Sequence, residues 1–190
     1  MKVQPLGVPD AFVVTPELHR DERGLLLEAF RADSLEAAAG RSFAIRQLNV
    51  TDSRRGVVRG VHFTAVPPGQ AKYVTCTAGA VLDVVVDLRV GSPTFGCHEL
   101  VELDAQSRSA VFLGEGLGHA FVTTSDESTV VYLSSAYYRP EHDRGVSPFD
   151  PELTHTGLES GHSTRELTEH RGTPLAPRLS GMLSLSDSRN

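Results

Sequence analysis

The stretch Ala71–Asp87 reads AKYVTCTAGAVLDVVVD and contains two runs rich in β-branched residues, Ala71–Thr77 and Ala80–Asp87. Gly79 separates the two runs, and a glycine in that position is typical of a turn between two strands. The pattern therefore predicts a pair of strands. Three further short runs, either β-branched or alternating, occur later in the chain, at His98–Leu103, Ala110–Leu113 and Thr129–Ser135.

Many short strands separated by turn residues indicate an all-β sandwich or barrel. The best helical signal is Asp33–Gly40, where we expect Asp33 to be the N-cap, Glu36 to lie at the N3 position and Gly40 to end the helix. Residues 151–190 are rich in Ser, Thr, Gly and His. We expect them to form a C-terminal extension that is weakly structured or holds one short helix within residues 163–170.

Size, charge and cysteine usage limit the classes of function. The chain has 190 residues, and its 24 acidic residues against 18 Lys and Arg give a formal charge of −6. This balance disfavours nucleic acid or an anionic membrane as partner. Its longest apolar stretch is too short to span a membrane, and no secretory signal is visible. Cys76 and Cys97 are too few for a disulfide framework, so we expect free thiols and a cytoplasmic protein.

Several polar residues interrupt otherwise apolar strands. Regular alternation along Arg59–Phe63 would place Arg59 and Val61 on one strand face and His62 on the other. Gln47 and Asn49 share a face of the segment Arg46–Val50. Buried polar groups are costly without partners, so polar residues that face inward on several strands favour a lined pocket. The other members of this group are Lys72, His119 and Tyr132.

Each of these residues, taken singly, also has an ordinary structural role. His62 fits a surface or core histidine, and Tyr132 fits a core aromatic whose hydroxyl binds the backbone. Lys72 and Arg59 fit solvated strand ends. Asp83 and Asp87 fit residues that orient loops or pair with arginine.

The sequence does not favour a metal site. Many small jelly-roll metal sites use two histidines two positions apart on one strand, but Phe63 and Thr64 follow His62 here. The ligand spacing that a metal requires is therefore missing.

An ordered set of motifs resembles the nucleotide-sugar 4-keto-6-deoxyhexose 3,5-epimerase family of the rhamnose and antibiotic deoxysugar pathways. The resemblance covers residues 1–150. It rests on Asp21–Gly24, Gln47–Asn49, Gly56–Phe63, Ala71–Val74, Asp83–Asp87, Gly91–Gly96, Gly118–Phe121, Tyr132 and Tyr138–His142. It implies a cupin-type double-stranded β-helix, or jelly roll, that works without cofactor or metal. It also implies a homodimer with exchanged N-terminal strands.

The resemblance also implies roles for individual residues. His62 matches the general base of the family, Tyr132 its acid on the opposite face, and Lys72 the residue near the C4 oxygen. Further positions match contacts to the sugar, the phosphates and the base of a dTDP-sugar. These are Arg23, Glu28, Gln47, Asn49, Arg59, His119 and Tyr138.

These residue types suit the chemistry. A C4 ketone acidifies the hydrogens at C3 and C5, so a neutral histidine can remove one of them and leave an enolate. A lysine beside O4 offsets the negative charge that grows there. Inversion then requires a second group that returns a proton to the opposite face of the ring.

The late segment departs from the family pattern. The family carries an aspartate there that orients the base histidine, and the ungapped position of that aspartate is Arg171 in this chain. Glu166, Glu169 or Asp83 could take its place. Leu26 also replaces an aromatic residue, and Thr64 replaces a glutamine.

The expected function is therefore the epimerisation of a dTDP-4-keto-6-deoxyhexose at C3, C5 or both. The main alternative is a catalytically inactive cupin-type protein that binds nucleotide sugars. A metal-dependent cupin enzyme is a weaker alternative.

Overall fold

The computed structural model describes residues 1–148, 150 and 153, and within them the chain forms mostly strands. The elements in chain order are β1 (Lys2–Pro5), β2 (Ala11–Thr15), β3 (Leu18–Asp21), β4 (Gly24–Leu27), α1 (Ala32–Ala39), β5 (Gln47–Arg54), β6 (Val58–Thr64), β7 (Lys72–Ala78), β8 (Ala80–Asp87), β9 (His98–Asp104), β10 (Ala110–Leu113), β11 (Leu117–Thr123), β12 (Glu127–Ser134) and β13 (Asp143–Gly145). The expectations for residues 151–190, including the roles of Glu166, Glu169 and Arg171, lie outside the described residues.

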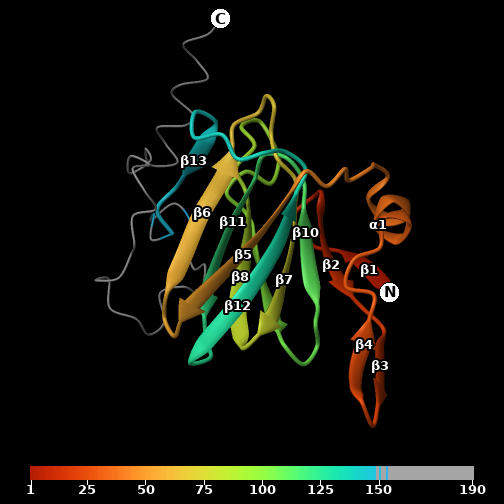
Figure 1. Cartoon of the computed structure of the whole chain (residues 1–190). Coiled ribbons are helices and arrows are strands. Elements are labelled where there is room, and N and C mark those ends of the chain that lie inside the picture. The colour runs from red at the N-terminus through yellow and green to blue at the C-terminus, as the bar shows by residue number, and fades with distance from the viewer. Residues whose placement is uncertain (149, 151–152, 154–190) are drawn as a thin grey trace, which may run out of the picture.

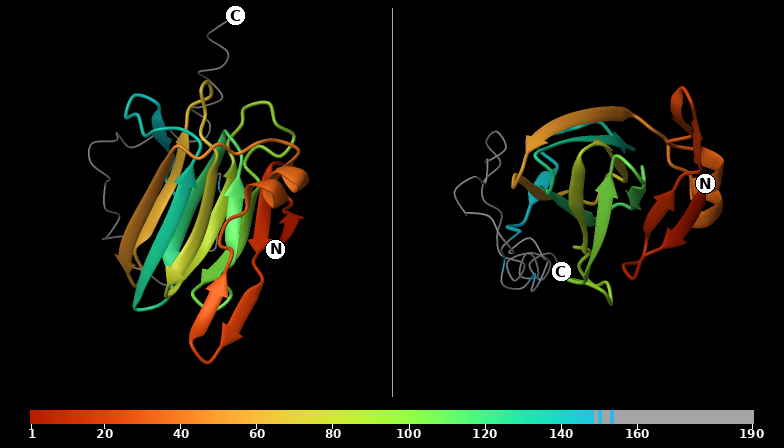
Figure 2. Two further views of the ribbon diagram at one scale, coloured as in Figure 1. Left: turned by 45° about the vertical axis from the view of Figure 1, so that its right-hand side comes forward. Right: turned by 90° about the horizontal axis from the view of Figure 1, so that it is seen from below.

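Two antiparallel sheets lie face to face (Figure 1). The larger has the order β1-β2-β10-β7-β12-β5, and the smaller has the order β13-β6-β11-β8-β9. Consecutive strands β5 and β6 belong to different sheets, so the chain crosses between the layers at one side of the sandwich (Figure 2). The predicted all-β jelly roll with a short helix near the N-terminus is confirmed.

The space between the sheets holds the main apolar core. Val74, Val111 and Val130 from the larger sheet pack against Val85 and Phe121 from the smaller one. These inward-facing residues alternate along each strand with residues that face outward, because successive side chains of a strand point to opposite faces of the sheet. A second cluster covers the outer face of the smaller sheet and includes Val58, Val61, Val84, Ala120 and Val146.

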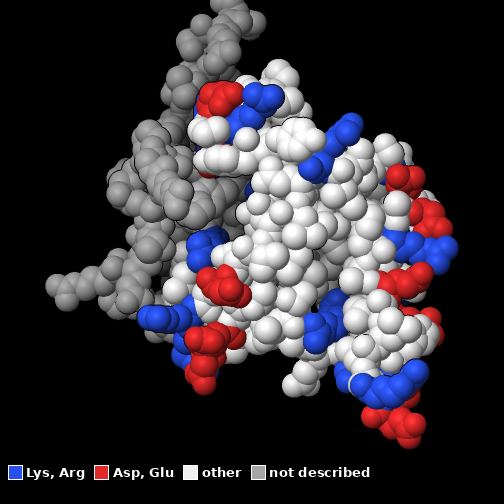
Figure 3. All heavy atoms as spheres, in the orientation of Figure 1, with Lys and Arg blue, Asp and Glu red and all other residues white. Residues whose placement is uncertain are grey.

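The outer face of the larger sheet is only partly covered. Helix α1 and its neighbours bury one half of it, where Leu35 and Phe43 pack with Tyr73 and Phe112. On β5, at the other end of the sheet, Leu48 and Val50 are each 58% exposed. Figure 3 shows this side of the molecule, with charged side chains gathered around a largely uncharged centre.

The cap of helix α1 differs from the prediction. The N-cap is Arg31, which makes no side-chain capping bond, and Asp33 lies inside the first turn. Asp33 instead forms an ion pair with Arg31, 2.7 Å from Nε to Oδ1, and the same oxygen accepts a hydrogen bond from the backbone N–H of Ser34 in the first turn at 2.7 Å. Gly40 ends the helix as expected, with a left-handed φ of 67° that a glycine adopts without strain. No helix in the described residues is long and apolar enough to cross a membrane.

Strands β3 and β4 form a separate hairpin that projects from the sandwich (Figure 1). Its registered pairs run from Leu18 with Leu27 to Asp21 with Gly24. The Arg20 side chain donates to the carbonyl of Gln106 at 3.2 Å. A two-stranded hairpin is marginally stable without further packing.

Candidate active site

The larger sheet presents four of the predicted site residues on its inner face. Ser134 of β12 lies opposite both Lys72 of β7 and Gln47 of β5. In the next row, Tyr132 lies opposite Val74 and Asn49. Residues directly opposite one another in a ladder share a face of the sheet. Lys72, Tyr132, Gln47 and Asn49 are therefore neighbours on one wall.

The smaller sheet supplies the other wall. His62 of β6 lies directly opposite His119 of β11, and Arg59 lies opposite Phe121. The register shifts between these two pairs, because three steps along β6 correspond to two steps along β11. This irregularity is a β-bulge.

The bulge overturns the predicted faces of β6. Regular alternation would put Arg59 and His62 on opposite faces, but the extra residue brings both to the inner face, while Val58 and Val61 pack outside. Gly60 is the residue that permits this. Its φ is 112°, and a Cβ there would lie 2.4 Å from the carbonyl oxygen of His119.

His119 is held by Asp83 of β8. The distance from Nε2 to Oδ2 is 2.6 Å, and both side chains are buried. The sequence analysis gives Asp83 as one candidate for the partner of His62. In its ordinary structural role, Asp83 was expected to orient a loop or to pair with an arginine. The structure places it on His119 instead, because Asp83 faces inward beside β11. Asp87 does pair with an arginine, Arg89, at 2.8 Å from Nη2 to Oδ2.

Lys72 is buried rather than at a solvated strand end, with 8% of its surface exposed. Burial lowers the pKa of Lys72, while the carboxylates of Asp143 and Asp83 act in the opposite direction. A lysine without water around it acts more strongly on a nearby negative charge, because little solvent screens it.

Tyr132 is partly buried against the inter-sheet core. Burial raises the pKa of its hydroxyl, Arg59 lowers it and Asp143 raises it. The phenol is thus kept protonated at neutral pH, as a proton donor must be.

Asp143 is the site residue that the sequence analysis missed. It lies on β13 opposite Thr64 of β6, beside the strand that carries His62. Its charge acts on Lys72, Tyr132 and Tyr138. The sequence feature that could have indicated Asp143 is its position directly after the family motif Tyr138–His142. Only the pairing of β13 with β6 turns that position toward the site.

The predicted residues Gln47, Asn49 and Tyr138 form a chain of contacts at the edge of the larger sheet. Gln47 Nε2 donates to Asn49 Oδ1, and the Tyr138 backbone N–H donates to Gln47 Oε1, both at 2.8 Å. Tyr138 is 57% exposed. An exposed aromatic ring fixed by its backbone offers a surface on which a planar group can stack.

Arg23 and Glu28 are the predicted residues that this chain does not bring to the site. They lie in and next to the projecting hairpin, away from β6 and β13 (Figure 1). Arg23 forms an ion pair with Asp21 at 2.6 Å, and Glu28 forms one with Arg31 at 3.3 Å.

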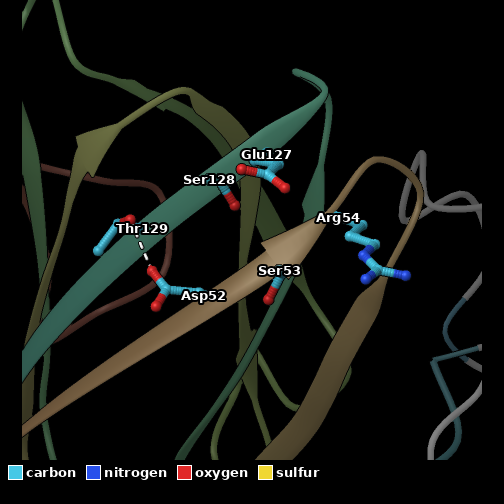
Figure 4. A pocket seen from close by; sticks show the side chains of 6 residues that line it. All are labelled: Asp52, Ser53, Arg54, Glu127, Ser128 and Thr129. Atoms are coloured by element: carbon cyan, nitrogen blue, oxygen red, sulfur yellow. Dashed lines mark hydrogen bonds between the residues drawn. The ribbon is translucent and has the colours of Figure 1, made fainter.

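A polar pocket lies at the end of β5 and the start of β12 (Figure 4). Its lining residues are Asp52, Ser53, Arg54, Glu127, Ser128 and Thr129. None of the predicted site residues lines it. Within residues 1–148, 150 and 153, no three His, Cys, Asp or Glu side chains gather as a metal site would require.

Comparison with known proteins identifies the family. The dTDP-4-dehydrorhamnose 3,5-epimerase family profile matches residues 5–168. A dTDP-4-dehydrorhamnose 3-epimerase of Streptomyces niveus is 49% identical over 100% of this chain and 86% of its own length. A dTDP-4-dehydrorhamnose 3,5-epimerase of Mycolicibacterium smegmatis is 51% identical over 79% of this chain and 75% of its own.

Solved structures give the same result. NovW, a 4-keto-6-deoxy sugar epimerase of Streptomyces spheroides, superimposes with a TM-score of 0.82 and 47% identity, over 99% of this chain and 90% of that one. The RmlC epimerase of Mycobacterium tuberculosis superimposes with a TM-score of 0.88 and 40% identity, over 98% and 92% of the two chains. The protein is thus an epimerase and belongs to the dTDP-4-dehydrorhamnose 3,5-epimerase family.

Proposed function

We propose that the protein inverts C3 of a dTDP-4-keto-6-deoxyhexose. The relatives from Streptomyces niveus and Mycolicibacterium smegmatis are named as epimerases of a dTDP-linked sugar, and C3 is the position that these two names share. ChmJ of Streptomyces bikiniensis, a 3′-monoepimerase 42% identical to this chain, has been solved with dTDP-quinovose. Inversion at C5 as well is the second possibility that the test below distinguishes.

The observation that carries the proposal is that His62 and Tyr132 lie on opposite walls. His62 belongs to the smaller sheet and Tyr132 to the larger, and both face the space between them. His62 takes the proton from carbon, and the electron pair moves into the C4 carbonyl to give an enolate. The buried Lys72 offsets the charge on that oxygen.

Tyr132 then gives its proton to the opposite face of the same carbon, and the carbonyl re-forms. His62 loses the proton it gained to solvent, and the Tyr132 phenolate takes one up, so the cycle closes without a redox step. Two groups on opposite sheets can invert a carbon stereocentre because each reaches the sugar ring from its own side.

We also propose a homodimer. The hairpin that carries Arg23, and Glu28 just after it, projects away from the body of its own chain (Figure 1), which suits a segment that completes the site of a second copy. The exposed apolar residues Leu48 and Val50 supply a face for that copy to cover. The cytoplasm is the proposed compartment, consistent with Cys76 and Cys97, which are free thiols.

The test is solvent deuterium incorporation at C3 and C5 of dTDP-4-keto-6-deoxyglucose, read by NMR with the purified protein. Incorporation at C3 supports the proposal, and incorporation at C5 as well identifies a 3,5-epimerase. Binding without incorporation would favour the inactive binding protein. Loss of incorporation after treatment with a chelator would favour the metal-dependent enzyme.

A further inference from the structure

The guanidinium of Arg59 is held by the neighbouring strand β5. Its Nε donates to Ser53 Oγ at 2.9 Å, and its Nη2 donates to the carbonyl of Asp52 at 3.1 Å. Ser53 is 7% exposed, so this hydroxyl has little access to competing water. Hydrogen bonds from a charged donor are stronger than those between neutral groups.

This contact joins the two sheets. The bulge at Gly60 turns Arg59 inward from the smaller sheet, and Ser53 ends the inward-facing series of polar residues on β5 in the larger sheet. Gln47, Asn49 and Thr51 precede it in that series. Arg59 therefore reaches across the side of the sandwich where β5 and β6 diverge.

The acceptors of Arg59 are themselves fixed. The Asp52 carboxylate accepts a hydrogen bond from Thr129 Oγ1 at 2.7 Å, which anchors the residue whose carbonyl binds Arg59 (Figure 4). Ser53 lies opposite Ser128 on β12, in a ladder whose register is unbroken from Glu127 with Arg54 to Ser134 with Gln47. Both acceptors thus belong to a regular part of the sheet, where ladder hydrogen bonds fix the backbone.

We propose that Ser53 is a positioning residue that aims Arg59 at the diphosphate of the substrate; this rests on the proposed function. Arginine has five N–H donors, and within the described residues two of them are engaged by Ser53 and Asp52. The remaining N–H groups lie on the far edge of the same planar group. Fixing Nε therefore fixes the direction in which the guanidinium meets a phosphate oxygen.

Ser53→Ala tests the proposal, with Ser128→Ala as the matched control that removes a buried hydroxyl from the adjacent strand without touching Arg59. We expect Ser53→Ala to raise both the Kd for dTDP, measured by calorimetry, and the KM for the dTDP-sugar by about three- to tenfold. We expect kcat to stay within about twofold, because the hydroxyl acts on binding rather than on proton transfer. Ser128→Ala and Ser53→Thr, which keeps the hydroxyl, should both bind dTDP like the wild type.

A double-mutant cycle separates positioning from a general loss of structure. In an Arg59→Ala background, Ser53→Ala should cause no further loss of dTDP affinity. An equal loss in both backgrounds, or wild-type binding by Ser53→Ala, would overturn the proposal. Failure of the proposed function would be seen separately, because the wild type itself would then exchange no deuterium into the sugar.

Discussion

His119 and Asp83 form a buried pair on adjacent strands, with 2.6 Å between Nε2 and Oδ2. Within the described part of the chain, the other carboxylate oxygen, Oδ1, has no hydrogen-bond partner. The carboxylate of Asp83 therefore directs its hydrogen bond to His119, and that bond fixes the orientation of the imidazole ring beside His62.

Asp83→Asn should lower kcat/KM about tenfold. The asparagine amide lacks the negative charge that holds His119. The substitution also removes one of the two carboxylates that act on Lys72. Steady-state kinetics on the dTDP-sugar would measure this. Asp104→Asn, at the last residue of β9, is the control, and equal activities of the two variants would contradict the assignment.

His62 and Tyr132 should fail in different ways. His62→Ala should reduce deuterium incorporation by about a hundred- to ten-thousandfold, because no base removes the proton. Tyr132→Phe should still wash deuterium into the substrate but form little inverted product. NMR of the recovered sugar would distinguish these outcomes, and full epimerisation by Tyr132→Phe would assign the acid elsewhere.

The alkaline limit of activity should depend on Asp143. Burial already lowers the pKa of Lys72 from its ordinary 10.5, and Asp143 opposes that shift. Asp143 also raises the pKa of Tyr132. Asp143→Asn should lower both values, so Lys72 loses its charge, and Tyr132 its proton, at lower pH.

The expected result is an alkaline limb of the kcat/KM profile that moves to lower pH in Asp143→Asn. Glu141→Gln is the matched control, since Glu141 is an exposed acid two positions earlier. If the alkaline limb of the kcat/KM profile stayed in place in both variants, Asp143 would not set the pKa values of Lys72 and Tyr132.

Asp87 should contribute to stability above acidic pH. Burial alone raises the pKa of Asp87, but hydrogen bonds from Arg89, Thr94 and Ser92 outweigh it and hold the pKa well below its usual range. A carboxyl with a lowered folded pKa stabilises the fold above its unfolded value of 3.8. That stabilisation is lost as the pH falls below this value.

Asp87→Asn should therefore reduce the free energy of unfolding by about 2–4 kcal/mol at pH 7, and the difference from the wild type should shrink below pH 4. Urea denaturation at both pH values measures this. Asp126→Asn, whose side chain is 95% exposed beside Arg55, should change stability little at either pH. A difference for Asp87→Asn that stays the same at acidic pH would contradict the mechanism.

The proposed dimer can be disrupted at Leu48. A charge buried in an apolar interface is costly, so Leu48→Glu should give a monomer at micromolar concentration in light scattering. The monomer should also lose activity, because Arg23 and Glu28 would no longer reach a second site. Leu100→Glu, at an exposed position of β9, should leave assembly unchanged. A dimeric Leu48→Glu would place the interface elsewhere.

Local sequence determined the strands themselves. Ala80–Asp87 and Ala110–Leu113 form β8 and β10 with the predicted bounds, because β-branched runs between turn residues have few other stable conformations. Gln47 and Asn49 share a face as predicted, since β5 has no bulge in that segment to interrupt its alternation. Gly40 ended the helix because left-handed backbone there is a local property.

Only the tertiary structure decided which residues meet. The bulge at Gly60 depends on the close approach of β11. Because of this bulge, Arg59 and His62 share a face, whereas regular alternation would place them on opposite faces. The pairing of Asp83 with His119 depends on the register between β8 and β11, and the entry of Asp143 depends on β13 joining β6. Contacts between strands distant in sequence are set by pairing and packing, which the local pattern of one strand does not contain.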